Sequence, residues 1–201
     1  NNAEGTEAQS LKSFDSDGFT MGTDAATNGS SRTYVAWCWK ANGSGSAQTD
    51  GDIDTVRSTN STSGFTIGTY TGSGTAGDTV GHGLSANPDV LIVKERGNVN
   101  SFVVSHKELT NQSGYYMLLN STDAQATDDW FNNTSHTTSV FSTNSTPTNR
   151  SSGTYVFYAW KEVQGFSKFG KYTGNGNADG TFVYTGFRPA FILQKVINTT
   201  S

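Results

Sequence analysis

The chain has 201 residues, a formal net charge of −4 at pH 7 and one cysteine. It lacks a basic cluster that would neutralise phosphates and an apolar run of membrane-spanning length, so neither nucleic-acid binding nor membrane insertion is expected. A single cysteine excludes an intrachain disulfide. Ser, Thr, Asn and Gly supply 93 residues and aromatic residues 12% of the chain. This composition favours β-folds with ring-filled cores and Thr- and Ser-covered faces.

Strand patterns dominate the chain. Residues 31–40 carry apolar side chains on both faces, which predicts a buried central strand with Trp37 and Trp39 in the core. Trp160, which corresponds to Trp39 in a repeated motif, is expected in the core as well. The strongest helix signal, 105–112, amounts to one or two turns. Further strands are expected at 64–72, 89–96, 101–106, 114–121, 128–134, 138–144, 153–162, 166–174, 181–187 and 190–197. Short strands separated by turn residues predict an all-β fold, an antiparallel β-sandwich or jelly roll with modules in tandem.

The chain also repeats itself. Residues 64–96 return in looser form at 165–195, and residues 28–40 return at 149–161, so that Tyr34 corresponds to Tyr155. A period of about 100 residues is that of a domain and not that of a solenoid. The repeat predicts four regions: the C-terminal half of a module (1–45), a Ser/Gly/Asn/Asp-rich linker (46–63), a complete module (64–164), and the N-terminal part of a following module (165–201), which we expect to pair with residues 1–45.

Local motifs indicate turns. Residues 72–77, GSGTAG, match the spacing of a nucleotide-binding loop, but the residues after them are a poor helix start, so a hairpin loop is expected. Residues 15–18 and 50–54 space carboxylates as calcium loops do, without the Glu that completes an EF-hand; Asx turns explain both. His82, His106 and His136 are too far apart for a local metal motif. We therefore expect no metal and no cofactor.

In order, the chain contains the motifs YVAW-x-W-K, YTG-x-G, GHGL, S-H-K-x-L, LLNST, W-x-N-N-T, T-S-V-F-S and YVFYAWKEVQGFSK. From about Phe14 to Lys195 it resembles a repeated module of large, tail-fibre-like structural proteins of marine bacteriophages. The matching residues include Tyr70, Gly72, His82, Gly83, Pro88, Lys94, His106, Asn120, Trp130, Thr134, Phe141, Tyr155, Trp160, Gly165 and Tyr172. The resemblance implies a virion-associated β-sandwich of the lectin-like style and carries no catalytic residue.

We therefore expect a non-enzymatic bacteriophage structural protein, extracellular on the virion in a tail fibre, spike or capsid decoration, that serves display or host attachment. Its expected partners are other virion proteins, further copies of itself, with a trimer left open, and a host surface glycan. The alternative is a carbohydrate-binding module whose ligand residues are Trp130, Asp128, Asn132 and Tyr116. A glycan-degrading enzyme would need two carboxylates across one groove. Asp128 and Asp129 would point to opposite faces if they were neighbours on a strand, so they are not expected to flank one sugar bond. A solvated turn before a core Trp130 is the preferred interpretation of these two carboxylates.

Overall fold

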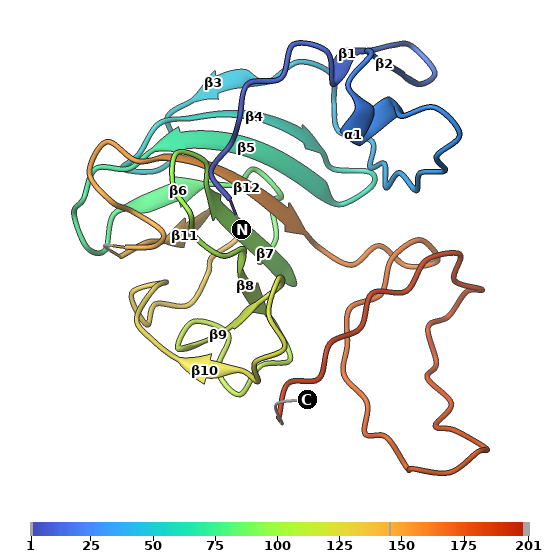
Figure 1. Ribbon diagram of the computed structural model, residues 1–201. Helices are drawn as coiled ribbons and strands as arrows, with labels where there is room; N and C mark the ends of the chain where they lie inside the picture. The colour runs from blue at the N-terminus through green and yellow to red at the C-terminus, as the bar shows by residue number, and fades with distance from the viewer. Residues whose placement is uncertain (1, 145, 199–201) are drawn as a thin grey trace. The chain divides into compact units, whose positions relative to one another are not determined.

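A computed structural model of the chain describes residues 2–144 and 146–198. These residues divide into two compact units, Glu4–Trp39 and the remainder. No helix in the described ranges is long and apolar enough to cross a membrane. The elements (Figure 1) are β1 (Leu11–Phe14), β2 (Phe19–Met21), α1 (Ala25–Asn28), β3 (Ser46–Gln48), β4 (Thr55–Asn60), β5 (Phe65–Thr71), β6 (Thr79–Gly81), β7 (Val90–Glu95), β8 (Val103–His106), β9 (Tyr115–Leu118), β10 (Ala126–Thr127), β11 (Val140–Ser142) and β12 (Thr154–Trp160).

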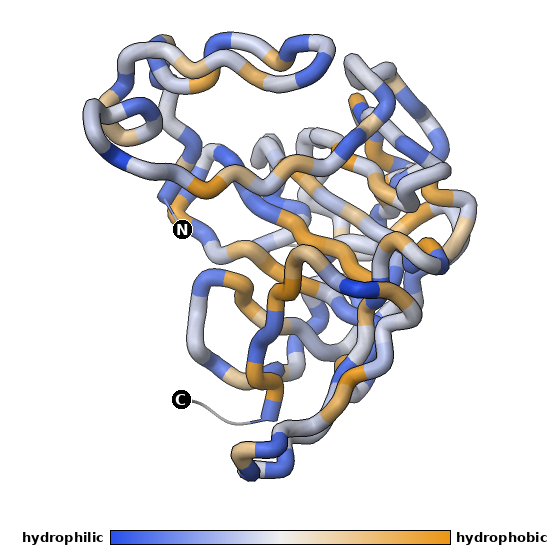
Figure 2. Tube along the Cα trace, turned by 90° about the vertical axis from the view of Figure 1, so that its right-hand side faces the viewer, coloured by the Kyte–Doolittle hydropathy of each residue, from blue (hydrophilic) through white to orange (hydrophobic). Residues whose placement is uncertain are grey.

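The larger unit contains an eight-stranded antiparallel sheet with the order β10-β9-β8-β7-β12-β5-β4-β3. The central strand is β12, which is flanked by β5 and β7, so that Tyr155 lies opposite Tyr70 on one side and Glu95 on the other. Hydrophobic positions are concentrated along these central strands (Figure 2). The expectation of an all-β antiparallel fold is confirmed.

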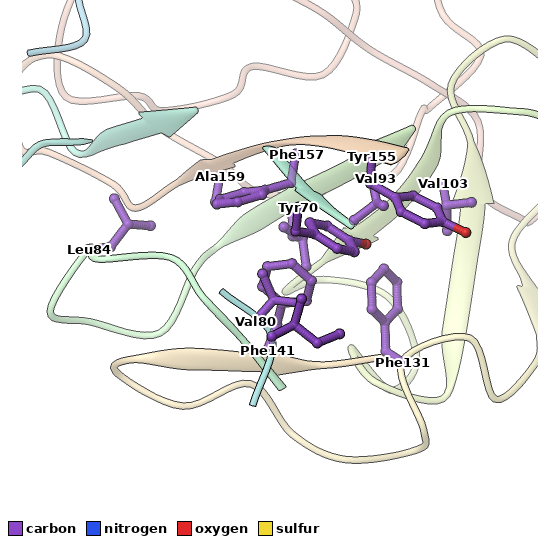
Figure 3. Close-up of a cluster of buried hydrophobic side chains, with 12 residues drawn as sticks. Tyr70, Val80, Leu84, Val93, Val103, Phe131, Phe141, Tyr155, Phe157 and Ala159 are labelled. Carbon is purple, nitrogen blue, oxygen red and sulfur yellow. The ribbon is translucent and has the colours of Figure 1, made fainter. Parts of the chain in front are cut away.

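A smaller sheet covers one face of the large one. It consists of β6 and β11, and its Val80 and Phe141 pack against Tyr70, Tyr155 and Phe157 of the large sheet (Figure 3). The rings of Tyr70 and Tyr155 stack with centroids 4.8 Å apart, and the ring of Phe141 meets that of Phe157 edge-on at 5.4 Å. Two antiparallel sheets with an apolar layer between them form a β-sandwich, the first of the two expected forms.

Gly68 of β5 shows how tightly this layer is packed. A Cβ at this position would lie 2.5 Å from the Phe157 ring, closer than atoms can approach. The Phe157 ring of β12 therefore lies directly on the backbone of β5, and only glycine permits that approach.

The expected linker, 46–63, is instead part of the large sheet. It contains β3 and β4, and β4 pairs with β5 over its whole length. In β4, Thr55 and Ser58 are buried, Val56 is exposed and the other three residues are partly buried. Composition was misleading here because Ser and Thr serve equally well on a strand and in a linker.

The expected strand at 31–40 is not formed. Trp37 and Trp39 are 61% and 45% exposed, so their assignment to the core is wrong. Trp160, in the corresponding strand β12, is half-buried with its ring centroid 5.1 Å from that of Phe65. The unit Glu4–Trp39 contains instead the β1–β2 hairpin and α1, whose first turn is capped by the side chain of Asp24.

Three further expectations fail locally. Residues 105–112 end β8 and continue in turns without a helix, and residues 128–134 contain a turn at 130–133 and no strand. Over 166–198 the structure contains only an isolated bridge between Val163 and Ser167. The pattern of 128–134 is broken by Asn132 and Asn133, whose φ angles of 53° and 47° are left-handed and incompatible with a strand.

Candidate functional site

An open pocket of about 410 Å³ lies beside the start of β9 at Tyr115 and the end of β10 at Thr127. It is lined by backbone and polar side chains from three short stretches of chain. Asp128 N donates to Gly114 O at 3.4 Å, and Tyr115 N donates to Asn111 O at 2.9 Å, so the stretches are tied together. The lining residues are Asn111, Gly114, Tyr115, Thr127, Asp128, Asp129 and Asn133.

The turn that follows β10 shapes this pocket. Phe131 anchors the turn because it is buried in the core, with its ring centroid 5.3 Å from that of His136. The left-handed conformations of Asn132 and Asn133 then reverse the chain, so that Asn133 lines the pocket. Gly114 leaves space for the converging amides, because a Cβ there would lie 3.1 Å from Asn133 Oδ1 and 3.2 Å from Asn111 Nδ2.

Two adjacent carboxylates line the same pocket. Asp128 and Asp129 follow the end of β10 at Thr127, and both are exposed. Neither residue belongs to a strand; both lie between β10 and the turn at 130–133. Asp128 Oδ1 accepts a hydrogen bond of 2.8 Å from the backbone N of Asp129, and the backbone O of Asp129 accepts one of 3.0 Å from Asn144 Nδ2. The carboxylate of Asp128 and the backbone of Asp129 are therefore held in place.

The expected ligand residues are only partly brought together. Asp128 lines the pocket, whereas Trp130, Asn132 and Tyr116 do not. Trp130 and Tyr116 are half-buried, have ring centroids 3.7 Å apart and pack against the hydrophobic core. The side chain of Asn132 lies near Thr134 Oγ1, at 3.5 Å from Nδ2. The sequence prediction left out Asn111 and Asn133. The Asn132-Asn133 pair next to Phe131 was a signal that could have found Asn133.

The chemistry of this pocket is that of hydrogen bonding to a polar, uncharged ligand. Its carboxylates accept hydrogen bonds and its amides both donate and accept them, while the Tyr115 ring supplies an apolar surface. Burial and, to a lesser extent, the carboxylates of Asp128 and Asp123 raise the pKa of Tyr116, so its hydroxyl stays protonated. Hydroxyl-rich molecules such as sugars have these complementary features.

A second polar cluster supports the fold from inside. The Glu95 side chain is fully buried and pairs with Arg150, which is half-exposed. Asn98 Nδ2 donates to Glu95 Oε1 at 2.7 Å, and Asn100 Nδ2 donates to Oε2. The carboxylate thus joins the loop after β7 to the loop before β12, and its hydrogen bonds offset the cost of burying the charge.

Two buried histidines are also held in place by the fold. His82 Nδ1 accepts from Leu84 N at 3.2 Å, so Nε2 carries the proton and donates to Thr137 O at 3.1 Å. His136 Nε2 lies 2.9 Å from Ser105 Oγ, which itself donates to Gln112 O. Burial lowers the pKa of each histidine to about 4, which keeps both neutral at pH 7.

Three of the five carboxylates with calcium-like spacing have hydrogen-bond partners within the protein. Asp15 accepts from Ser13 and Thr20 in the turn between β1 and β2. Asp50 forms two bonds with Arg57, at 2.5 and 2.9 Å, and the hydrogen bond from Arg57 lowers the pKa of this carboxyl. Asp52 accepts from Thr79 Oγ1 at 2.7 Å. Within the described ranges, no group of three or more His, Cys, Asp or Glu side chains is arranged to hold a metal ion.

The loop at 72–77 is also structural. Its backbone amides at Ser73 and Gly74 donate to Asn149 Oδ1, and β6 follows it. The expected hairpin is not formed, because β6 pairs with β11 in the smaller sheet and not with β5, so the loop crosses from one sheet to the other.

Comparison with known proteins returned a family but no characterised relative. A family described as Domain of unknown function (DUF7483) matches residues 1–201. No curated protein and no solved structure matches the chain.

Proposed function

The chain belongs to the DUF7483 family, and we propose that it is a non-enzymatic structural module of a bacteriophage virion, part of a tail fibre, spike or capsid decoration that serves display or host attachment. The observation that carries this proposal is the repeat. The repeated motif at 149–161 contains β12, the central strand of the large sheet, and the repeated segment 64–96 contains its two neighbours β5 and β7, so the repeat covers the sequence of the centre of that sheet. One chain with parts of several copies of one rigid scaffold is typical of arrays that display loops or bind by many weak contacts.

The motif resemblance to tail-fibre-like modules and the surface chemistry support this role. Ser, Thr, Asn and Gly make up nearly half of the chain and charged residues only 15%. Recognition by uncharged polar groups depends little on ionic strength, because salt screens charges and not hydrogen bonds.

Location in the virion can be tested directly. Particles from the source should be purified on a density gradient, and antibodies raised against the purified chain used for immunogold electron microscopy. We expect gold at one fixed position on each particle, and the protein in the particle fraction by mass spectrometry. Absence from intact particles, with the protein in the soluble fraction, would contradict the proposal.

A second candidate function is glycan binding at the pocket of Asp128, Asn111 and Asn133. Its support is the pocket itself, with hydrogen-bonding side chains beside the Tyr115 ring. A single site of this kind binds weakly, but repetition of the site along an array raises the overall affinity.

A glycan array with the purified chain tests this function. We expect binding to one glycan class, lost in Asp128→Ala and Asn133→Ala, and retained in Asp179→Ala, a control at an exposed carboxylate outside the pocket. Binding that survives both pocket variants would exclude the pocket as the site. Release of reducing sugar ends, abolished in Asp129→Asn, would contradict the non-enzymatic part of the proposal, because a hydrolase needs a pair of carboxylates.

A further inference from the structure

Three segments of the chain match strands of the large sheet but do not form strands. The donor segment, residues 33–39, corresponds to β12, because TYVAWCW matches TYVFYAW. The acceptor segments, residues 166–173 and 190–196, correspond to β5 and β7. In the structure neither the donor nor the acceptor segments belong to a sheet.

All three segments carry exposed apolar side chains. In the donor segment Val35 is 87% exposed, and in the acceptor segments Ile192 and Leu193 are 70% and 58% exposed. A soluble protein rarely leaves so many apolar groups in water unless another surface covers them.

The acceptor segments approach each other without pairing. The Tyr172 hydroxyl donates to Gln194 Oε1 at 2.9 Å. Among the described residues, no backbone hydrogen bond joins 166–173 to 190–196. In the structure the backbone amides of Phe166 and Ser167 bond to Val163 O, so a strand inserted here would replace such local bonds with those of a sheet. The counterparts β5 and β7 have β12 between them in the large sheet.

We propose that two copies of this chain exchange their donor segments, each inserting residues 33–39 between the acceptor segments of the other. The exchange is argued from the repeat and from the register of the sheet, and it does not depend on the proposed role in a virion. The register follows from β12, in which Ala159 lies opposite Leu91 and Tyr158 opposite Ile92. In the exchanged pair Cys38 therefore lies opposite Ile192, and Trp37 opposite Leu193.

The points where these segments leave the sheet favour a closed pair over an open filament. Lys40 O accepts from Asn60 Nδ2 at 3.1 Å, and Lys161 N donates to Gly64 O at 2.9 Å. Donor and acceptor segments thus leave the sheet at the same turn, 60–64. Two copies that meet at this end can exchange both donors at once and close with two-fold symmetry.

The first test is site-directed crosslinking through the single cysteine. Cys38 is exposed in the structure, and its counterpart Ala159 is fully buried between β5 and β7. The native chain is mixed at high concentration with a C38A/I192C variant and oxidised mildly. We expect a disulfide-linked dimer of the two different chains, because directly opposite residues have Cβ atoms close enough for a disulfide.

The matched control is a C38A/L193C variant, in which the new thiol lies one residue away and on the opposite face. We expect its crosslinked dimer to be absent or faint. Equal crosslinking at 192 and 193, or none at 192, would overturn the proposal. So would a monomer with an internal disulfide when I192C is introduced into the native chain at low concentration, since that result would assign the partner to the same chain.

A second test needs no disulfide. We expect light scattering to give twice the chain mass for the native protein, and the Cys38 thiol to lose its reactivity toward Ellman's reagent as the dimer forms. Ile192→Arg should give a monomer with a reactive thiol. Val99→Arg, at a site that is 65% exposed and outside all three segments, should remain dimeric. A monomeric native chain with a reactive Cys38 at the highest soluble concentration would overturn the proposal.

Discussion

Strand β12 and the donor segment have nearly the same sequence and different structures. In β12, Tyr155 is fully buried, has a neighbouring strand on each side and stacks on Tyr70. In the donor segment the corresponding Tyr34 is 49% exposed and its hydroxyl is bonded to local backbone at Gly29 and Ala25. An apolar alternating pattern therefore makes a strand only where two further strands are available to pair with it.

The largest expected difference in stability between these two regions comes from a pair of matched substitutions. Tyr155→Ala should lower the free energy of unfolding by about 3–5 kcal/mol, because it leaves a cavity in the aromatic layer. Tyr34→Ala, at the corresponding position, should change the stability of the monomer by about 0.5 kcal/mol or less. Urea unfolding at low protein concentration measures both. Equal losses in the two variants would show that residues 33–39 are packed in the monomer.

Arg150→Ala should have the next largest effect, a loss of about 3 kcal/mol, because it leaves the buried Glu95 carboxylate without its cation. The repeat has no equivalent pair, since Glu95 corresponds to Val196 and Arg150 to Gly29. The ion pair is thus a property of the complete module alone. Chemical unfolding should show the loss, with Arg188→Ala, at an exposed site, as the control. A loss equal to that of the control would mean that the two asparagines suffice to hold the carboxylate.

Acid should destabilise the complete module selectively. The unfolded chain binds protons at His82 and His136 below pH 6.5, whereas the folded chain binds them only below about 4. Stability is therefore full above pH 6.5 and is lost as the pH falls toward 4, by up to about 3 kcal/mol for each histidine. His136→Gln should reduce the slope of unfolding free energy against pH in this range by one proton. An unchanged slope would show that His136 is protonated as easily in the folded chain as in the unfolded one.

The smallest effect is expected at the pocket. Asp128→Asn changes an exposed side chain on a turn, so the melting temperature should stay near that of the native protein, with a change in stability of about 0.5 kcal/mol or less. Differential scanning calorimetry measures it. A large loss would mean that Asp128 supports the turn and is not available for a ligand.

Part of the pocket could be anticipated from the sequence. Asp128 was a candidate because a carboxylate beside aromatic residues is typical of sugar sites. The roles of Trp130 and Tyr116 were not predictable, because a ring on a surface platform and a ring at the edge of a core have the same sequence environment. The core lies behind Trp130 only because Phe131 and Thr148 bring the turn against it.

The sequence by itself determined the secondary structure class and the positions of β5, β7, β8, β9, β11 and β12, because alternating aromatic and β-branched residues bounded by Gly, Asn and Pro favour strands. It also revealed the repeat. Only the tertiary structure decided which copy of the repeated strand is a strand. The reason is that a β-strand is stabilised by hydrogen bonds and side chains of its neighbours, and those neighbours are distant in sequence. Residues 154–160 have both neighbours, whereas residues 33–39 have the same pattern without them.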